Sequence, residues 1–168
     1  LFANLPDFKA NAQGEIWFGL QPGGSVDFEG NLGVGEVPLN WLADVPPVTD
    51  IKTDITGWFT PGSDWGLRLQ GFSLGWSDTE IEPLNLVFNQ RLGSQWHDFD
   101  LSVNNLDLTL VSELVYTTRI AEQKVLDNVD HLQPRGIVDA LTLGRNEDGY
   151  YASANLQALD IAAWKKAP

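Results

Sequence analysis

Cysteine is absent from this chain of 168 residues, and so is methionine. Without thiols the protein forms no disulfide and no thiolate metal site. The lack of methionine, in a chain that opens on Leu1, predicts a processed or excised piece of a longer protein. No apolar run approaches the roughly 18 residues of a transmembrane helix, so neither a spanning helix nor a signal peptide is expected in this piece.

Basic residues are also scarce. Ten Lys and Arg stand against 23 Asp and Glu, which gives a formal net charge of −13. Only Lys165 and Lys166 are adjacent. Nucleic acids and anionic membranes both require clustered basic side chains, so neither is expected as a direct partner of this piece. The ordinary consequence of the charge is solubility.

Short runs of alternating hydrophobic and polar residues fill most of the chain, and turns rich in Gly, Pro, Asn and Asp separate them. The turns are expected at 21–24, 61–64 and 145–149. Strands are predicted at 14–20, 25–34, 50–60, 65–76, 84–90, 96–108, 137–144 and 150–156. The alternation changes phase near Gly71, which predicts a β-bulge or a kink.

One stretch has a helical period instead. Hydrophobic residues recur at three- and four-residue steps over 110–131, which predicts one amphipathic helix or two short ones broken near 116–118. The sequence QPRG at 133–136 should end it. The predicted fold class is therefore mainly β: an extended, strongly bent antiparallel sheet with one or two short helices. Residues 1–168 are interpreted as a single segment, with 1–48 and 49–168 as possible sub-units.

Residue types that carry chemistry are few. His97, Asp98 and Asp100 are the nearest approach to a catalytic cluster, but His97 and Asp98 are neighbours that a strand directs to opposite faces. His131 falls at the expected end of a helix, where a cation suits the dipole. The acidic run at 78–82 lacks the glycine and the closing glutamate of a calcium loop. We therefore predict no enzymatic activity, no cofactor and no metal site.

The seven tryptophans are the unusual feature of the composition. Trp17 and Trp58 lie in the phase opposite to the apolar residues of their strands. Such rings either stack on sugar rings or cover a sheet edge, and the structural role is favoured. The seven are Trp17, Trp41, Trp58, Trp65, Trp76, Trp96 and Trp164.

Part of the chain resembles a known family. Residues 132–143 (LQPRGIVDALTL) are similar to an element of the YhdP branch of the AsmA-like proteins, in which a helix ends at a Leu-x-Pro-x-Gly stop and leads into a strand. Residues 151–168 resemble the strand and the Trp-bearing loop that follow it there. The stretches 53–71 and 105–110 also have a residue pattern similar to that of the family. The resemblance covers about 45–168.

The resemblance implies a bent periplasmic β-sheet with a hydrophobic groove, in a protein anchored in the inner membrane of Gram-negative bacteria and involved in carrying phospholipids towards the outer membrane. Its partners would be lipid acyl chains and neighbouring segments of the same chain, with membrane contact only through parts outside this piece. The expected groove residues are Ile16, Phe18, Val26, Phe28, Ile55, Leu67, Leu69, Leu86, Phe88, Phe99, Leu101, Val103, Leu141 and Leu143.

Alternation alone leaves other interpretations open, because it shows which face of a strand avoids water but not what covers that face. The same residues could fill the closed core of a carbohydrate-binding β-sandwich module, with the out-of-phase tryptophans as its sugar-stacking groups. They could also belong to a purely structural β segment that binds neither lipid nor sugar.

Overall fold

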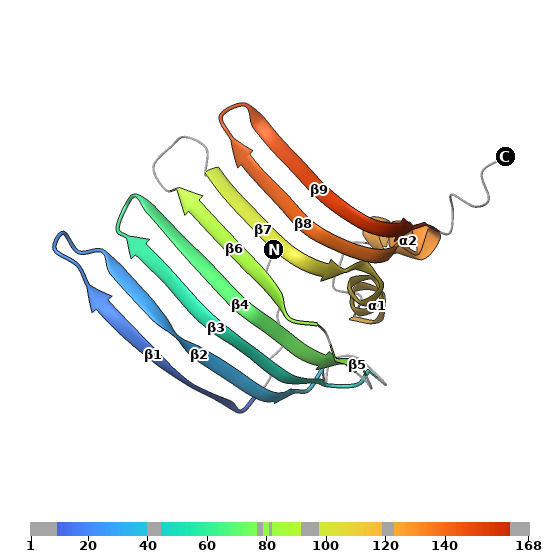
Figure 1. The fold of residues 1–168 in the computed structure, drawn as a ribbon, viewed down its shortest axis with the longest axis horizontal. Coiled ribbons are helices and arrows are strands. Elements are labelled where there is room, and N and C mark those ends of the chain that lie inside the picture. The colour runs from blue at the N-terminus through green and yellow to red at the C-terminus, as the bar shows by residue number, and fades with distance from the viewer. Residues whose placement is uncertain are drawn as a thin grey trace.

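A computed structural model describes residues 10–39, 45–76, 79–80, 82–91, 98–118 and 123–161. All strands in this part belong to one antiparallel sheet, whose order is β1-β2-β3-β4-β6-β7-β8-β9, with the short β5 beside β4 (Figure 1). The sheet is open, with β1 and β9 at its two edges. The predicted fold class is confirmed. The strands are β1 (Ala12–Leu20), β2 (Val26–Val37), β3 (Val48–Thr60), β4 (Asp64–Trp76), β5 (Thr79–Glu80), β6 (Leu84–Arg91), β7 (Asp98–Asp107), β8 (Arg135–Asn146) and β9 (Gly149–Asp160).

The predicted turns join neighbouring strands at one end of the sheet. In the first, the Gln21 N–H donates to the Ser25 carbonyl and the Gly24 N–H to the Gln21 carbonyl. The last turn is shorter than expected, because β8 continues through Asn146. The Asn146 side chain then accepts from the Asp148 N–H at 3.0 Å, an Asx turn that returns the chain into β9. At these turns the two joined strands therefore pair as simple hairpins.

The predicted bulge in β4 is present. Leu69 and Phe72, three residues apart, pair with Leu86 and Leu84, which are two residues apart on β6. Two residues of β4, Gln70 and Gly71, therefore lie opposite one residue of β6. Gly71 has a φ of 60°. The bulge reverses the alternation, so that Leu69 and Phe72 share a face. The buried Thr53 hydroxyl donates to the Gln70 carbonyl at the same place, at 3.2 Å.

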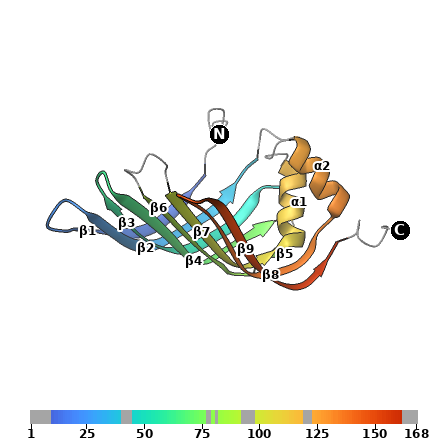
Figure 2. The ribbon, with the colours of Figure 1, turned by 90° about the horizontal axis from the view of Figure 1, so that it is seen from above.

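Similar left-handed residues recur near the same end of other strands. Asp50 in β3, Asn105 in β7 and Ala158 in β9 all have positive φ. Such residues interrupt the regular ladder and bend the strands that carry them. Figure 2 shows the sheet curving toward the side on which the helices stand. The bend thus lies at the helical end of the sheet.

Two short helices follow β7: α1 (Leu108–Thr118) and α2 (Gln123–Leu132). The Asp107 carboxylate caps α1 by accepting from the Thr109 N–H at 2.8 Å. α2 ends at Leu132, and Gln133 closes it in a left-handed conformation before Pro134. Of the two predicted alternatives, two short helices are present and the predicted stop is confirmed, but the predicted break at 116–118 is wrong, because α1 continues through Thr118. Neither described helix has the length and apolar character needed to cross a membrane.

The buried core is small and lies under α1. Trp76 is 2% exposed and packs against Leu110, with Leu39, Val45, Val48, Leu74 and Leu114 around the pair. Among the described hydrophobic residues, the others that are buried are Val103, Leu126 and Val138. Most apolar side chains of the sheet are therefore half-buried or exposed.

Candidate binding surfaces of the sheet

The register places hydrophobic side chains in rows that cross the whole sheet. Residues directly paired across an antiparallel ladder share a face. One row reads Phe18, Phe28, Gly57, Leu67, Phe88, Leu101, Leu143 and Ala152. The row on one side reads Ile16, Gly30, Ile55, Leu69, Leu86, Val103, Leu141 and Ala154, and the row on the other reads Leu20, Val26, Phe59, Trp65, Gln90, Phe99, Arg145 and Tyr150. We call the face with these three rows the apolar face.

All fourteen residues expected to line a groove lie on this apolar face, because each belongs to one of the three rows. Three further residues lie on the same face and share the phase of their neighbours, although they were not among the fourteen: Leu20, Phe59 and Trp65. The position of the fourteen side chains is thus established, and their contact with lipid remains a prediction.

The apolar face is covered unevenly. Its helical end is under α1, where Val138 and Leu110 are buried. Toward the turns its side chains are half-buried, and on the edge strand β1 they are open: Phe18 is 70% exposed and Leu20 is 78% exposed. No second sheet covers this face within the described residues, so the β-sandwich considered from the sequence is wrong as an architecture. Alternation could not distinguish an open face from a closed core.

Aromatic side chains pack against one another on the apolar face. Trp65 and Phe88 have ring centroids 4.9 Å apart, and Phe88 and Phe99 are 6.3 Å apart. The Trp65 indole N–H donates to the Gln90 side-chain oxygen at 2.9 Å, which satisfies both polar groups within the face. Phe18 and Phe28 make a further pair at 6.2 Å.

The opposite face is polar, but aromatic side chains interrupt it. The polar row next to the apolar one reads Gly19, Asp27, Trp58, Gly66, Asn89, Asp100, Gly144 and Tyr151. We call it the polar-face row. The predicted opposite phase of Trp17 and Trp58 is confirmed, since Trp17 pairs with Glu29 and Trp58 with Asp27. Trp41, Trp96 and Trp164 lie outside the described residues.

Two rings of the polar-face row lie over glycines. A Cβ added at Gly66 would overlap with the six-membered ring of Trp58, and one added at Gly144 would overlap with the Tyr151 ring. Each ring therefore occupies the space over the glycine of the neighbouring strand. Glycine is the residue that leaves this space free.

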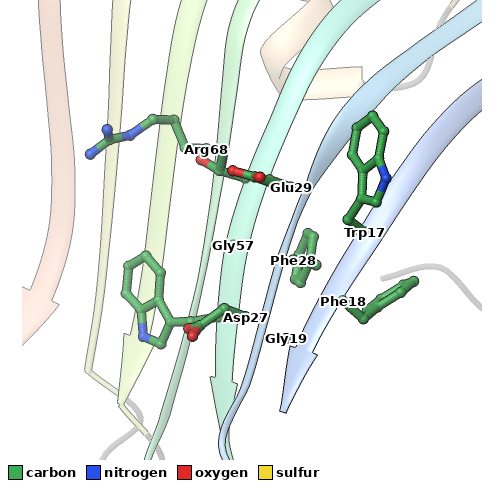
Figure 3. Close-up of a pocket in the computed structure, with 10 residues that line it drawn as sticks. Trp17, Phe18, Gly19, Asp27, Phe28, Glu29, Gly57 and Arg68 are labelled. Atoms are coloured by element: carbon green, nitrogen blue, oxygen red, sulfur yellow. The ribbon is translucent and has the colours of Figure 1, made fainter. Parts of the chain in front are cut away.

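Two hollows open on this side. One has a volume of about 640 Å³ and is lined by side chains that include Trp17, Trp58, Asp27, Glu29 and Arg68. Figure 3 shows Trp17, Glu29 and Arg68 rising from β1, β2 and β4. The other, of about 280 Å³, includes Asn89, Asp98, Asp100 and Tyr151.

Asp98 and Asp100, which the sequence places in a possible catalytic cluster, interact with Tyr151 in the structure. The Tyr151 hydroxyl donates to the Asp100 carboxylate at 2.9 Å. This hydrogen bond, helped by desolvation and by the charges of Asp100 and Asp98, raises the pKa of Tyr151. His97 lies outside the described residues, and no group of three or more metal-ligating side chains occurs in the described part. His131 is in the last turn of α2, as expected.

The Asp100→Asn variant should titrate Tyr151 at lower pH, because the carboxylate no longer penalises the phenolate. The raised pKa means that the contact contributes stability below the pKa of the unfolded chain and loses it as pH rises through the folded pKa. Tyrosinate absorbance against pH measures the effect, and Tyr151→Phe identifies the tyrosine that titrates. Unchanged titration in Asp100→Asn would contradict this assignment.

Comparison with protein-family models, curated proteins and solved structures finds no match.

Proposed function

We propose that this chain is a segment of a periplasmic, inner-membrane-anchored protein that carries phospholipids between the inner and outer membranes, and that its apolar face holds the acyl chains. One observation carries the proposal: two rows made only of apolar residues and glycine run from strand to strand across an open sheet, beside a third row that is interrupted by Gln90 and Arg145, and no second layer covers them in the described part. The anchor, the location and the transport itself come from the family resemblance.

The dimensions suit an acyl chain. Eight strands at a spacing of about 4.8 Å give a row about 34 Å long. An acyl chain reaches about 15 Å, half of the roughly 30 Å hydrocarbon core of a bilayer. A row is therefore long enough for one chain to lie across several strands.

The energies suit transfer. A fully buried CH₂ contributes about 0.8 kcal/mol, so a chain lying on an open face with half of its surface covered gains about 0.4 kcal/mol for each CH₂. Ten such groups give about 4 kcal/mol, a Kd of about 1 mM, and two chains give about 8 kcal/mol, a Kd of about 1 μM. A lipid with two chains would be held and still released.

A charge on the apolar face should weaken this binding. Leu101→Glu places a carboxylate in the middle row, where a bound chain would have to desolvate it, and we expect at least about tenfold weaker binding of a fluorescent fatty acid. Phe18→Glu, at a residue that is 70% exposed, makes the same test at little cost in stability. Lipid extracted from the purified protein should decrease in parallel.

Ser102→Glu is the matched control, because Ser102 follows Leu101 on β7 and points to the polar face. It should bind the fatty acid as the parent does, with the fold of all variants checked by circular dichroism. Equal binding by the parent, Leu101→Glu and Phe18→Glu would disprove the lipid site.

A further inference from the structure

The polar face carries aromatic platforms that the lipid proposal does not use. Trp58 lies over Gly66 on β4, and Tyr151 lies over Gly144 on β8. Each ring contacts the sheet at its glycine and keeps part of its surface exposed: Trp58 is half-buried, and Tyr151 is 41% exposed. Rings fixed in this way offer flat surfaces at a low entropic cost.

Polar groups lie between the two platforms. Asn89 and Asp100 occupy the strands between Gly66 and Gly144 in the same row. Asn89 and Asp100 both line the smaller hollow together with Tyr151, and Asp100 has hydrogen-bonding capacity beyond the Tyr151 hydroxyl. The row thus places an amide and a carboxylate, groups that bind vicinal hydroxyls, between two ring surfaces.

The spacing suits an elongated ligand. The strands under the two rings, β4 and β8, are three inter-strand spacings apart, about 14 Å. The hollow beside Trp58 has a volume of about 640 Å³ and also contains Trp17, which is 56% exposed. This volume is in the range of sites for organic ligands and exceeds what a small ion needs.

We propose that the polar-face row is a binding site for a short linear oligosaccharide, whose pyranose rings stack on Trp58 and Tyr151 while Asn89 and Asp100 bind its hydroxyls. Flat rings favour a sugar over a quaternary ammonium ion, because an ammonium ion is bound best between rings that form walls around it. The acidic surroundings disfavour an anionic ligand. The site is on the other face from the proposed lipid site and does not depend on it.

The experiment titrates the protein with cello-, malto- and chito-oligosaccharides and follows tryptophan fluorescence and heat. At least one series should bind saturably, with affinity rising with chain length up to the span of the row. Trp58→Ala should weaken binding about tenfold, the loss expected for one aromatic stacking contact. Tyr151→Ala should do the same, which keeps the test valid if Trp58→Ala does not fold.

Phe59→Ala is the matched control, since Phe59 follows Trp58 on β3, lies on the apolar face and is 43% exposed. It should leave sugar binding unchanged, and Trp58→Ala should leave fatty-acid binding unchanged. The proposal is overturned if no series binds at millimolar concentration, if Trp58→Ala and Tyr151→Ala bind like the parent, or if tetramethylammonium displaces the sugar at lower concentration.

Discussion

Trp76→Ala is expected to lower the free energy of unfolding by about 3–5 kcal/mol, the cost of removing a large aromatic side chain from a closed site. Trp76 is 2% exposed and has the largest fully buried side chain in the described part of the chain. It joins the end of β4 to Leu110 of α1, so a cavity there also loosens the helix from the sheet. Urea unfolding followed by circular dichroism measures the change.

Trp17→Ala provides the comparison, because it removes the same side chain from a position that is 56% exposed. We expect a change within about 0.5 kcal/mol. Since the buried core is small, Trp76 should account for much of the total stability of the chain. Similar losses in the two variants would show that α1 does not depend on this contact.

Gly66→Val is expected to destabilise the protein by roughly 1–3 kcal/mol, although valine is normally favoured in a strand. The new Cβ would overlap with the Trp58 ring, which has to leave the strand surface. Thermal unfolding measures the loss, and Trp58 fluorescence should move toward that of an exposed indole.

Gly19→Val is the matched control, since Gly19 is in the same polar-face row and a Cβ there meets nothing within 4 Å. It should be neutral or stabilising. The double variant Trp58→Ala/Gly66→Val should lose less than the sum of the two single variants, because the overlap is gone. Strict additivity would show that the ring does not rest on Gly66.

Much of the fold could be predicted from local sequence. The alternation in β1 to β4, the phase change at Gly71 and the stop at Gln133 and Pro134 each depend on a few adjacent residues, and each is confirmed. Because the side-chain period of a strand is two, the same alternation also assigned the fourteen groove candidates to the correct face. The local sequence pattern was therefore sufficient to predict features that depend on a single strand or turn.

The polar-face row could not be predicted, because it exists only through pairing. Trp58, Asn89 and Asp100 are brought together by the register of four strands. Tyr151 joins them from a strand 51 residues beyond Asp100 in the sequence. No single strand signals this alignment. The absence of a second layer in the described part could not be predicted either, because a half-covered strand and a strand in a closed core have the same alternation.

The left-handed residues near the helical end of the sheet also constrain how this protein can change in length. Deleting one residue such as Gly71 would turn the rest of β4 over, so that Trp76 would leave α1 and face the polar side. Asp50, Asn105 and Ala158 mark similar points in β3, β7 and β9. Insertions and deletions during evolution should therefore be tolerated at the hairpin turns around 21–25 and 146–149. Near the bend they would have to occur in neighbouring strands together.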